Sequence, residues 1–125
     1  MWVSDNIAGI LYVTGIVTCL PLLQFFAPQA MLKALNKLTI ADEAGLFFAR
    51  HWGIVVFSVG ALLVYAAGHA EFRGPVMLAA LIEKVGLIGA IASNWNRPFA
   101  RGLRGAAIFD SACVLLYGAY LLKLG

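Results

Sequence analysis

The amino-acid sequence predicts an all-α integral membrane protein: an up-down bundle of four transmembrane helices, with a short interfacial helix between the first and the second. Of its 125 residues, 62% are hydrophobic and only 12% are charged, and the apolar residues gather in four separate segments. A membrane-spanning helix needs about 20 apolar residues, and soluble domains use apolar residues for only about half of their sequence. We therefore expect residues 1–125 to form a single transmembrane domain, without a further soluble domain.

The first helix is expected at residues 7–26. Asp5, and not Lys or Arg, precedes this segment, and no small-x-small cleavage site follows it, so we interpret it as a retained helix and not as a signal peptide. Pro21 lies near its end and should kink or loosen the last turns, because proline lacks the backbone N–H that a helix interior needs.

The interfacial helix is expected at residues 28–38. Apolar residues recur there at helical spacing, with polar and basic residues between them. This pattern is typical of a helix on the membrane surface, or of an amphipathic connector packed against the end of the bundle. The apolar residues are Met31, Leu32, Leu35 and Leu38, and the others are Lys33, Asn36 and Lys37.

The remaining helices are expected at residues 44–67, 74–93 and 105–122. A soluble bundle would carry a polar stripe on every helix, but residues 54–65 contain almost no polar residue, so lipid is the predicted solvent. The short connections at 68–73 and 94–104 make sequential helices antiparallel neighbours.

The distribution of basic residues predicts the orientation in the membrane. Short loops rich in Lys and Arg stay in the cytoplasm. One end of the expected bundle carries Lys33, Lys37, Arg97, Arg101 and Arg104, whereas the other carries only Arg73 and Lys123. Both termini should therefore be non-cytoplasmic. The formal charge of +3 comes without a basic and aromatic patch, so we expect the partner to be a lipid bilayer and no nucleic acid.

Five ionisable residues lie inside the apolar segments: Arg50, His51, Glu83, Lys84 and Asp110. An Arg, Lys or Asp at the middle of a membrane helix costs roughly 2.5 to 3.5 kcal/mol, so such residues are expected to pair, to line a water-filled cavity or to bind a ligand. With His51 neutral, the other four side chains sum to zero charge. We expect them in the middle and cytoplasmic half of one bundle interior.

Helical spacing predicts which way these side chains face. Glu83 and Asp110 share their helix faces with small residues, which let membrane helices approach closely, so both acids should point inward. Lys84 shares its face with large apolar residues and should stand at the bundle edge or snorkel. Arg50 is then the expected counter-ion of one acid. Such a bridge can also serve only to fix the helix register.

The candidate proton-transfer residues are Glu83, His51 and Asp110. Histidine titrates near neutral pH, and a carboxyl group in a dry environment can exchange protons there. The candidate ligand-binding residues are Arg50, Trp52, Lys84, Ser58 and Tyr117. No metal site is expected, because the cysteines lack metal-binding spacing and a lone histidine is more often hydrogen-bonded. The sequence does not identify a cofactor.

The stretch Ala49-Arg50-His51-Trp52-Gly53 opens the second segment, and acidic residues lie in the third and fourth. In these features and in its four-helix pattern the chain resembles the DoxX-like small bacterial membrane proteins. The resemblance implies a four-helix fold in a bacterial cytoplasmic membrane, and some members of that group are linked to quinone-associated or thiol-redox complexes. This chain has no paired-cysteine motif, and no catalytic residue follows from the resemblance.

Three functions are compatible with these features. The first is binding of an apolar or amphipathic, lipid-soluble small molecule inside the bundle, with proton exchange. The second is that of a non-catalytic subunit or assembly factor, in which small-residue helix faces join a homo-oligomer or a larger membrane complex. The third is a membrane enzyme, an isomerase or a quinone-linked oxidoreductase, acting on a lipid-soluble substrate.

Overall fold

The computed structural model describes residues 2–36 and 42–122, and these residues form helices and loops without a strand. The predicted all-α class is confirmed. The longer helices are α2 (Ile7–Cys19), α5 (Glu43–Ala67), α6 (Arg73–Ser93) and α8 (Arg104–Leu121). The shorter elements are α1 (Trp2–Asp5), α3 (Leu22–Phe26), α4 (Pro28–Met31), a π-helical turn η1 (Leu32–Asn36), a 3-10 turn η2 (Ala70–Phe72) and α7 (Pro98–Arg101).

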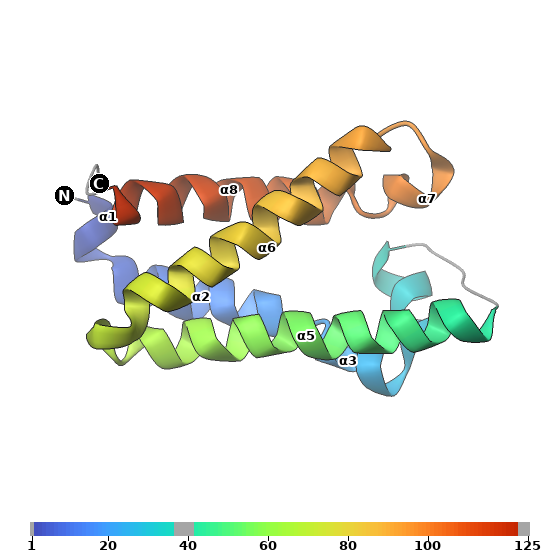
Figure 1. Cartoon of the computed structure of the whole chain (residues 1–125), viewed down its shortest axis with the longest axis horizontal. Coiled ribbons are helices and arrows are strands. Elements are labelled where there is room, and N and C mark those ends of the chain that lie inside the picture. Colours follow the sequence, from blue (N-terminus) through green and yellow to red (C-terminus); the bar gives the residue numbers. More distant parts are fainter. Residues whose placement is uncertain (1, 37–41, 123–125) are drawn as a thin grey trace.

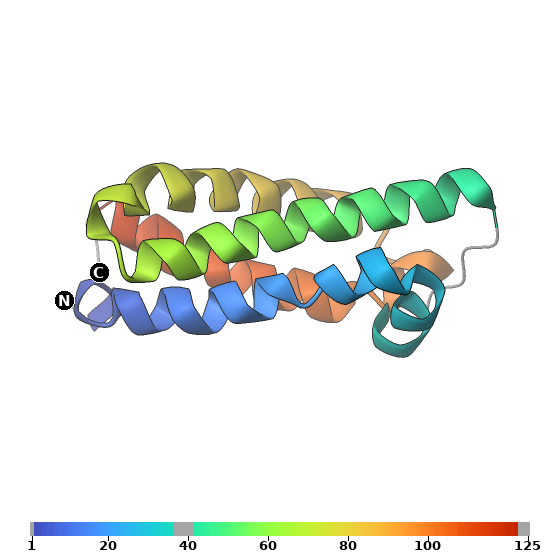
Figure 2. The ribbon, with the colours of Figure 1, turned by 90° about the horizontal axis from the view of Figure 1, so that it is seen from below.

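The longer helices run lengthwise through the molecule, and both termini lie at one end (Figures 1 and 2). Two groups of helices pack most closely within themselves: α2 and α3 lie along α5, and α6 lies along α8. The two groups separate toward the end that carries α7 (Figure 1). This separation positions the candidate site described below.

The first apolar segment is interrupted at the predicted proline. α2 ends at Cys19, and Pro21 is the residue that precedes α3. Gln24 of α3 is buried, and its side-chain amide donates a hydrogen bond of 2.6 Å to the backbone carbonyl of Ala49 in α5. After the break at Pro21, α3 is thus held against α5 by the hydrogen bond of the Gln24 side chain.

The connector between α3 and α5 is helical through Asn36, with α4 followed by η1. Leu32 is 3% exposed and packs inward. Residues 37–41, including Lys37 and Leu38, lie outside the described residues. The position of this connector at a membrane surface stays a prediction.

Glycines let α5 pack directly against the first segment. A Cβ atom at Gly53 would lie 2.6 Å from the carbonyl oxygen of Pro21, and one at Gly60 would lie 2.7 Å from the backbone nitrogen of Cys19. Both neighbours are backbone atoms, which cannot move aside as a flexible side chain can. At these two positions only glycine allows the observed approach.

Gly53→Ala and Gly60→Ala are each expected to destabilise the fold by about 1 to 3 kcal/mol, the usual cost of overpacking a well-packed interior. Gly86→Ala on α6 is the matched control, because a Cβ atom there meets nothing within 4 Å. In a helix with free space, Gly→Ala stabilises by roughly 0.5 to 1 kcal/mol. Thermal unfolding in detergent should therefore show a lower melting temperature for Gly53→Ala and Gly60→Ala and a higher one for Gly86→Ala. Equal shifts for all three variants would contradict the glycine contact.

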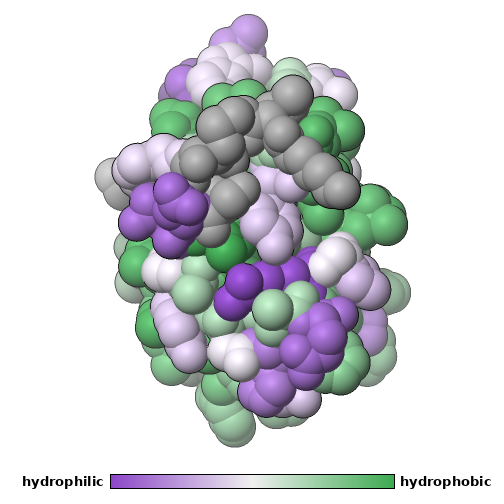
Figure 3. All heavy atoms as spheres, turned by 90° about the vertical axis from the view of Figure 1, so that its left-hand side faces the viewer, coloured by the Kyte–Doolittle hydropathy of each residue, from purple (hydrophilic) through white to green (hydrophobic). Residues whose placement is uncertain are grey.

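The apolar core lies in the half of the molecule nearer the termini, where Leu11, Leu63, Met77 and Tyr117 are fully buried. Arg73 closes this end, because its guanidinium donates hydrogen bonds to the carbonyls of Ala66 (2.9 Å) and Ala67 (2.7 Å) in the last turn of α5. A cation at a helix C-terminus satisfies carbonyls that have no partner within the helix. Seen from this end, hydrophilic residues gather near the centre and hydrophobic residues cover the sides (Figure 3).

Three stretches of the described chain are long and apolar enough to cross a membrane: Ile7–Phe26, Glu43–Ala67 and Ala70–Ser93. Large apolar side chains point outward from the helices, including Phe26, Phe47, Ile82 and Leu115. Exposed apolar surface on this scale is typical of lipid-facing helices. These features indicate an integral membrane protein. α8, with 18 residues, is not among the three stretches.

Candidate functional site: a cavity between the helix groups

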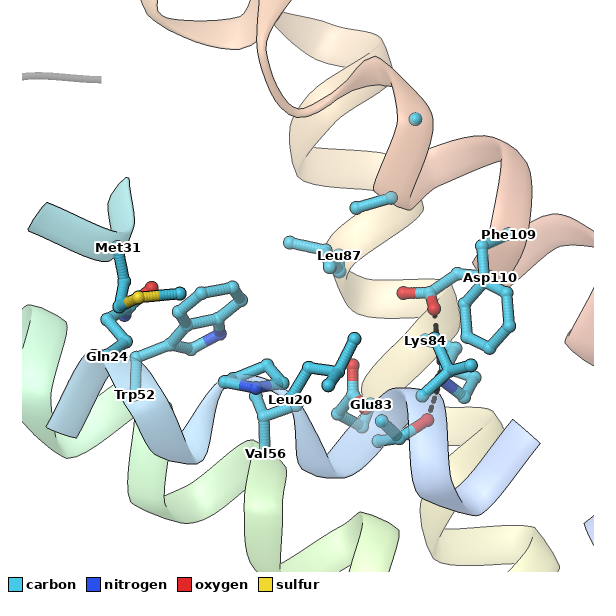
Figure 4. Close-up of a pocket in the computed structure, with 15 residues that line it drawn as sticks. Leu20, Gln24, Met31, Trp52, Val56, Glu83, Lys84, Leu87, Phe109 and Asp110 are labelled. Carbon is cyan, nitrogen blue, oxygen red and sulfur yellow. Dashed lines mark hydrogen bonds and ion pairs between the residues drawn. The ribbon is translucent and has the colours of Figure 1, made fainter. Parts of the chain in front are cut away.

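A cavity of about 310 Å³ lies where the two helix groups separate. The first apolar segment, α4 and α5 form one wall, and α6 and α8 form the opposite wall (Figure 4). Most of the lining is apolar or aromatic, with a few polar groups among it. The large apolar side chains are Leu20, Met31, Trp52, Val56, Leu87 and Phe109. This composition is typical of a small-molecule site.

Lys84 of α6 and Asp110 of α8 form a buried ion pair at the cavity wall (Figure 4). The Lys84 Nζ lies 2.9 Å from the Asp110 Oδ1, and the residues are 1% and 5% exposed. The same Nζ donates a 3.2 Å hydrogen bond to the Thr18 hydroxyl and lies 5.0 Å from the centre of the Phe109 ring. The ammonium group thus has a carboxylate, a hydroxyl and an aromatic face as neighbours, which compensate for its removal from water.

A chain of hydroxyl groups connects the Lys84 ammonium to the apolar core. Thr18 donates a 2.7 Å hydrogen bond to the carbonyl of Thr14, and the Thr14 hydroxyl shares a hydrogen bond with the Tyr117 hydroxyl. Tyr117 is fully buried. It therefore joins α2 to α8 beside the core and does not line the cavity.

Glu83 lines the same cavity, and its surroundings differ from those of Asp110. The Glu83 side chain is half-buried, and its Oε1 is a buried oxygen without a hydrogen-bond partner among the described residues. A buried polar atom without a partner costs roughly 1 to 3 kcal/mol. A proton on this carboxyl group, or a ligand atom that reaches it, would therefore be stabilising.

Of the predicted site residues, the structure brings together Glu83, Lys84, Asp110 and Trp52 at one cavity. Two expectations about their neighbours are wrong. Lys84 does not stand at the bundle edge but is almost fully buried. Asp110 takes Lys84, and not Arg50, as its counter-ion. The physical reason is rotation about the helix axis, because the buried face of α6 carries Lys84 together with Met77, Ala80 and Ile91.

Arg50, His51 and Ser58 are exposed and do not line this cavity. Ser58 donates a 2.9 Å hydrogen bond to the carbonyl of Ile54 in its own helix, which satisfies the hydroxyl locally. Arg50 lines a second, smaller hollow with residues 26–30 and Leu46. The five intramembrane ionisable residues therefore do not form one interior group.

The length of α5 explains how Arg50 and His51 can be exposed. The helix has 25 residues, about 37 Å at ~1.5 Å per residue, whereas the hydrocarbon core of a bilayer is about 30 Å thick. Arg50 stands two turns from the start of α5. Long basic side chains at such a position reach the interface by snorkelling.

Thr18, Gln24 and Phe109 contribute to the site but were not among the predicted residues. A general rule could have found Thr18: a buried ammonium group needs hydrogen-bond acceptors besides its carboxylate. Phe109 carries a weaker signal, namely its place beside Asp110 in the sequence. Nothing in the sequence pattern marks Gln24, because its role depends on the break at Pro21.

Comparison of the chain with models of protein families, with curated proteins and with solved structures finds no match. Among the described residues, the titratable side chains that line the cavity are Glu83, Lys84 and Asp110, which provide two carboxyl groups and one ammonium group. No group of three or more His, Cys, Asp and Glu suited to a metal ion occurs within residues 2–36 and 42–122.

Proposed function

We propose that this chain is a small membrane protein that binds an apolar or amphipathic small molecule in the cavity between its two helix groups, with proton exchange at Glu83. The observation that carries the proposal is the combination of apolar walls with a carboxyl group whose buried oxygen has no partner. Burial of apolar surface supplies about 25 cal/mol per Å², and a few polar groups give orientation. His51, exposed on the outer side of α5, has no part in this proposal.

The same proposal includes the four-span, up-down topology in a bacterial cytoplasmic membrane, with α8 as the fourth span and both termini non-cytoplasmic. The orientation is supported by the position of α4 and α7, which lie at the end opposite to the termini (Figure 1). This end contains Lys33, Arg97, Arg101 and Arg104, and basic residues stay in the cytoplasm. The resemblance to DoxX-like proteins supports the bacterial membrane.

A cavity-filling variant tests the proposed binding. A Cβ atom at Gly105, which lines the cavity, meets nothing within 4 Å, so Gly105→Phe should fold and fill the space. Gly86→Phe is the matched control, because Gly86 is an exposed helical glycine with equally free surroundings that does not line the cavity. The probe is menadione, a neutral aromatic quinone that quenches tryptophan fluorescence.

The measurement uses a background in which Trp2 and Trp95 are replaced by Phe, so that Trp52 is the only fluorophore of its kind. In this background, and in the Gly86→Phe variant of it, we expect the Trp52 fluorescence to be quenched with saturation as menadione is added. In the Gly105→Phe variant we expect only linear quenching, because menadione then reaches Trp52 only by partition into the membrane. Linear quenching in all three proteins, or saturation with equal affinity in all three, would show that the cavity is not the binding site.

A further inference from the structure

The charge balance of the cavity points to the class of ligand. With all three groups ionised, Glu83, Lys84 and Asp110 sum to one negative charge, because one ammonium group faces two carboxylates. Arg50, the other cation of the apolar segments that could balance the sum, is exposed and lines a different hollow. Among the described residues, the carboxyl groups that line the cavity therefore outnumber the cationic groups by one.

The excess charge belongs to Glu83 and not to Asp110. Asp110 holds the Lys84 ammonium at 2.9 Å, whereas a buried oxygen of Glu83 has no hydrogen-bond partner in the part of the chain that the structure describes. Figure 4 shows the Glu83 carboxylate beside the open space between Leu20 and Leu87, with the ion pair to one side. A ligand that enters this space meets Glu83 as a carboxylate that makes no salt bridge among the described residues.

An anionic ligand does not fit the arrangement. Among the described residues, Lys84 is the only cationic side chain that lines the cavity, and its ammonium group already contacts Asp110, Thr18 and the ring of Phe109. A metal ion does not fit either, because hard cations take six or more oxygen ligands and transition metals need clustered side chains. The described residues provide no such cluster.

We propose that the cavity binds a lipophilic organic monocation, such as a quaternary ammonium or phosphonium ion, with Glu83 as its counter-ion. This inference rests on the proposed function and names its ligand class. The apolar walls receive the organic groups, and the indole of Trp52, opposite Lys84 across the cavity in Figure 4, adds an aromatic ring, a group that attracts organic cations.

Binding of such a cation is coupled to a proton. A proton and the ligand compete for the same carboxylate, so a protonated Glu83 releases its proton to water as the cation enters, and the charge of the cavity stays unchanged. The other titratable groups around Glu83 are Lys84 on its own helix, and Asp110 and Cys113 on α8. The wall formed by the first segment and α5 presents Thr18, Gln24 and Trp52, which do not titrate in this range.

The test measures displacement of menadione from the Trp52 protein by tetraphenylphosphonium and by tetraphenylborate, two ions of nearly equal shape and opposite charge. We expect the phosphonium ion to bind at least tenfold more tightly than the borate ion. Its affinity should rise with pH until Glu83 is fully ionised, whereas the affinity for neutral menadione should change less than twofold. In a lightly buffered solution, phosphonium binding should acidify the medium.

Glu83→Gln, which keeps the shape of the side chain, should weaken phosphonium binding at least tenfold and abolish its pH dependence. Glu71→Gln, at an exposed glutamate in η2, is the matched control and should change neither. Equal affinities for the two ions, or an unchanged phosphonium affinity in Glu83→Gln, would overturn the cation inference while the proposed function stands. Menadione quenching that is linear in the Trp52 protein would overturn both.

Discussion

Lys84→Met is expected to lower the free energy of unfolding by about 3 to 5 kcal/mol, the usual cost of removing one partner of a buried ion pair. The reason is the carboxylate that remains: Asp110 is 5% exposed and would lose its only ion-pair partner among the described residues. Met fills a similar volume, so cavity formation adds little. Unfolding in a detergent mixture of increasing denaturing strength, or a thermal melt in mild detergent, measures the loss.

A second variant separates this effect from a general sensitivity of the site. Lys84→Met combined with Asp110→Leu removes both charges and replaces them with apolar groups, which is often neutral or stabilising in buried pairs. Thr18 keeps its hydrogen bond to the carbonyl of Thr14, so no hydroxyl is orphaned. The double variant should regain most of the stability that Lys84→Met loses. If the double variant is as unstable as Lys84→Met, the unpaired Asp110 carboxylate is not the cause of the lost stability.

Arg50→Met is the matched control for this series. Arg50 is exposed and makes no salt bridge within the described part of the chain, so its replacement should change stability by less than about 0.5 kcal/mol. A large loss would restore Arg50 as a structural counter-ion.

The sequence was sufficient for the helical class, for the interruption at Pro21 and for placing Asp110 inside the protein. Each of these depends on a local property: apolar segment length, the missing N–H of proline, or the small residues that flank an acid. The buried face of α8, with Ala107, Asp110, Cys113 and Tyr117, follows the predicted helical spacing.

The identity of the counter-ion could not be predicted, because it depends on how each helix is rotated about its axis. On α6, the rule that small residues face neighbouring helices holds for Ala80 but not for the other small residues near Glu83: Ala79, Gly86 and Ala90 are exposed, whereas Met77 and Lys84 are buried. The buried face of α6 is instead formed mainly by larger side chains. Lys84 therefore points inward, although the large apolar residues on its helix face predicted a position at the bundle edge.

The same rule succeeds on α5. Ala49, Gly53 and Gly60 form its buried face, and each further residue turns by about 100° around a helix of 3.6 residues per turn. Arg50 and His51 follow directly after Ala49 and are thereby turned away from this face. The positions of the small residues on α5 therefore predict that Arg50 and His51 are exposed. Their depth along the helix does not predict it, because depth carries no information about rotation.

Asp110→Asn is expected to reduce the affinity for tetraphenylphosphonium at least tenfold, although Glu83 is still present. Asparagine keeps the shape of the side chain but removes one negative charge, so that Lys84 and Glu83 alone determine the charge of the cavity and sum to zero. The Lys84 ammonium, 1% exposed, has lost the Asp110 carboxylate but still acts on Glu83, and its positive field opposes an entering cation.

Menadione quenching distinguishes this effect from a loss of the fold. Menadione should still quench Trp52 with saturation, because its binding depends on the apolar walls and not on the charge balance. The discrimination between tetraphenylphosphonium and tetraphenylborate should largely disappear, and the Glu71→Gln control should keep it. An Asp110→Asn protein that binds menadione and retains full phosphonium affinity would mean that Glu83 attracts the cation regardless of its neighbours, and that the Lys84 and Asp110 pair is purely structural. The excess charge of the cavity, and not the presence of a carboxylate alone, is what the cation inference requires.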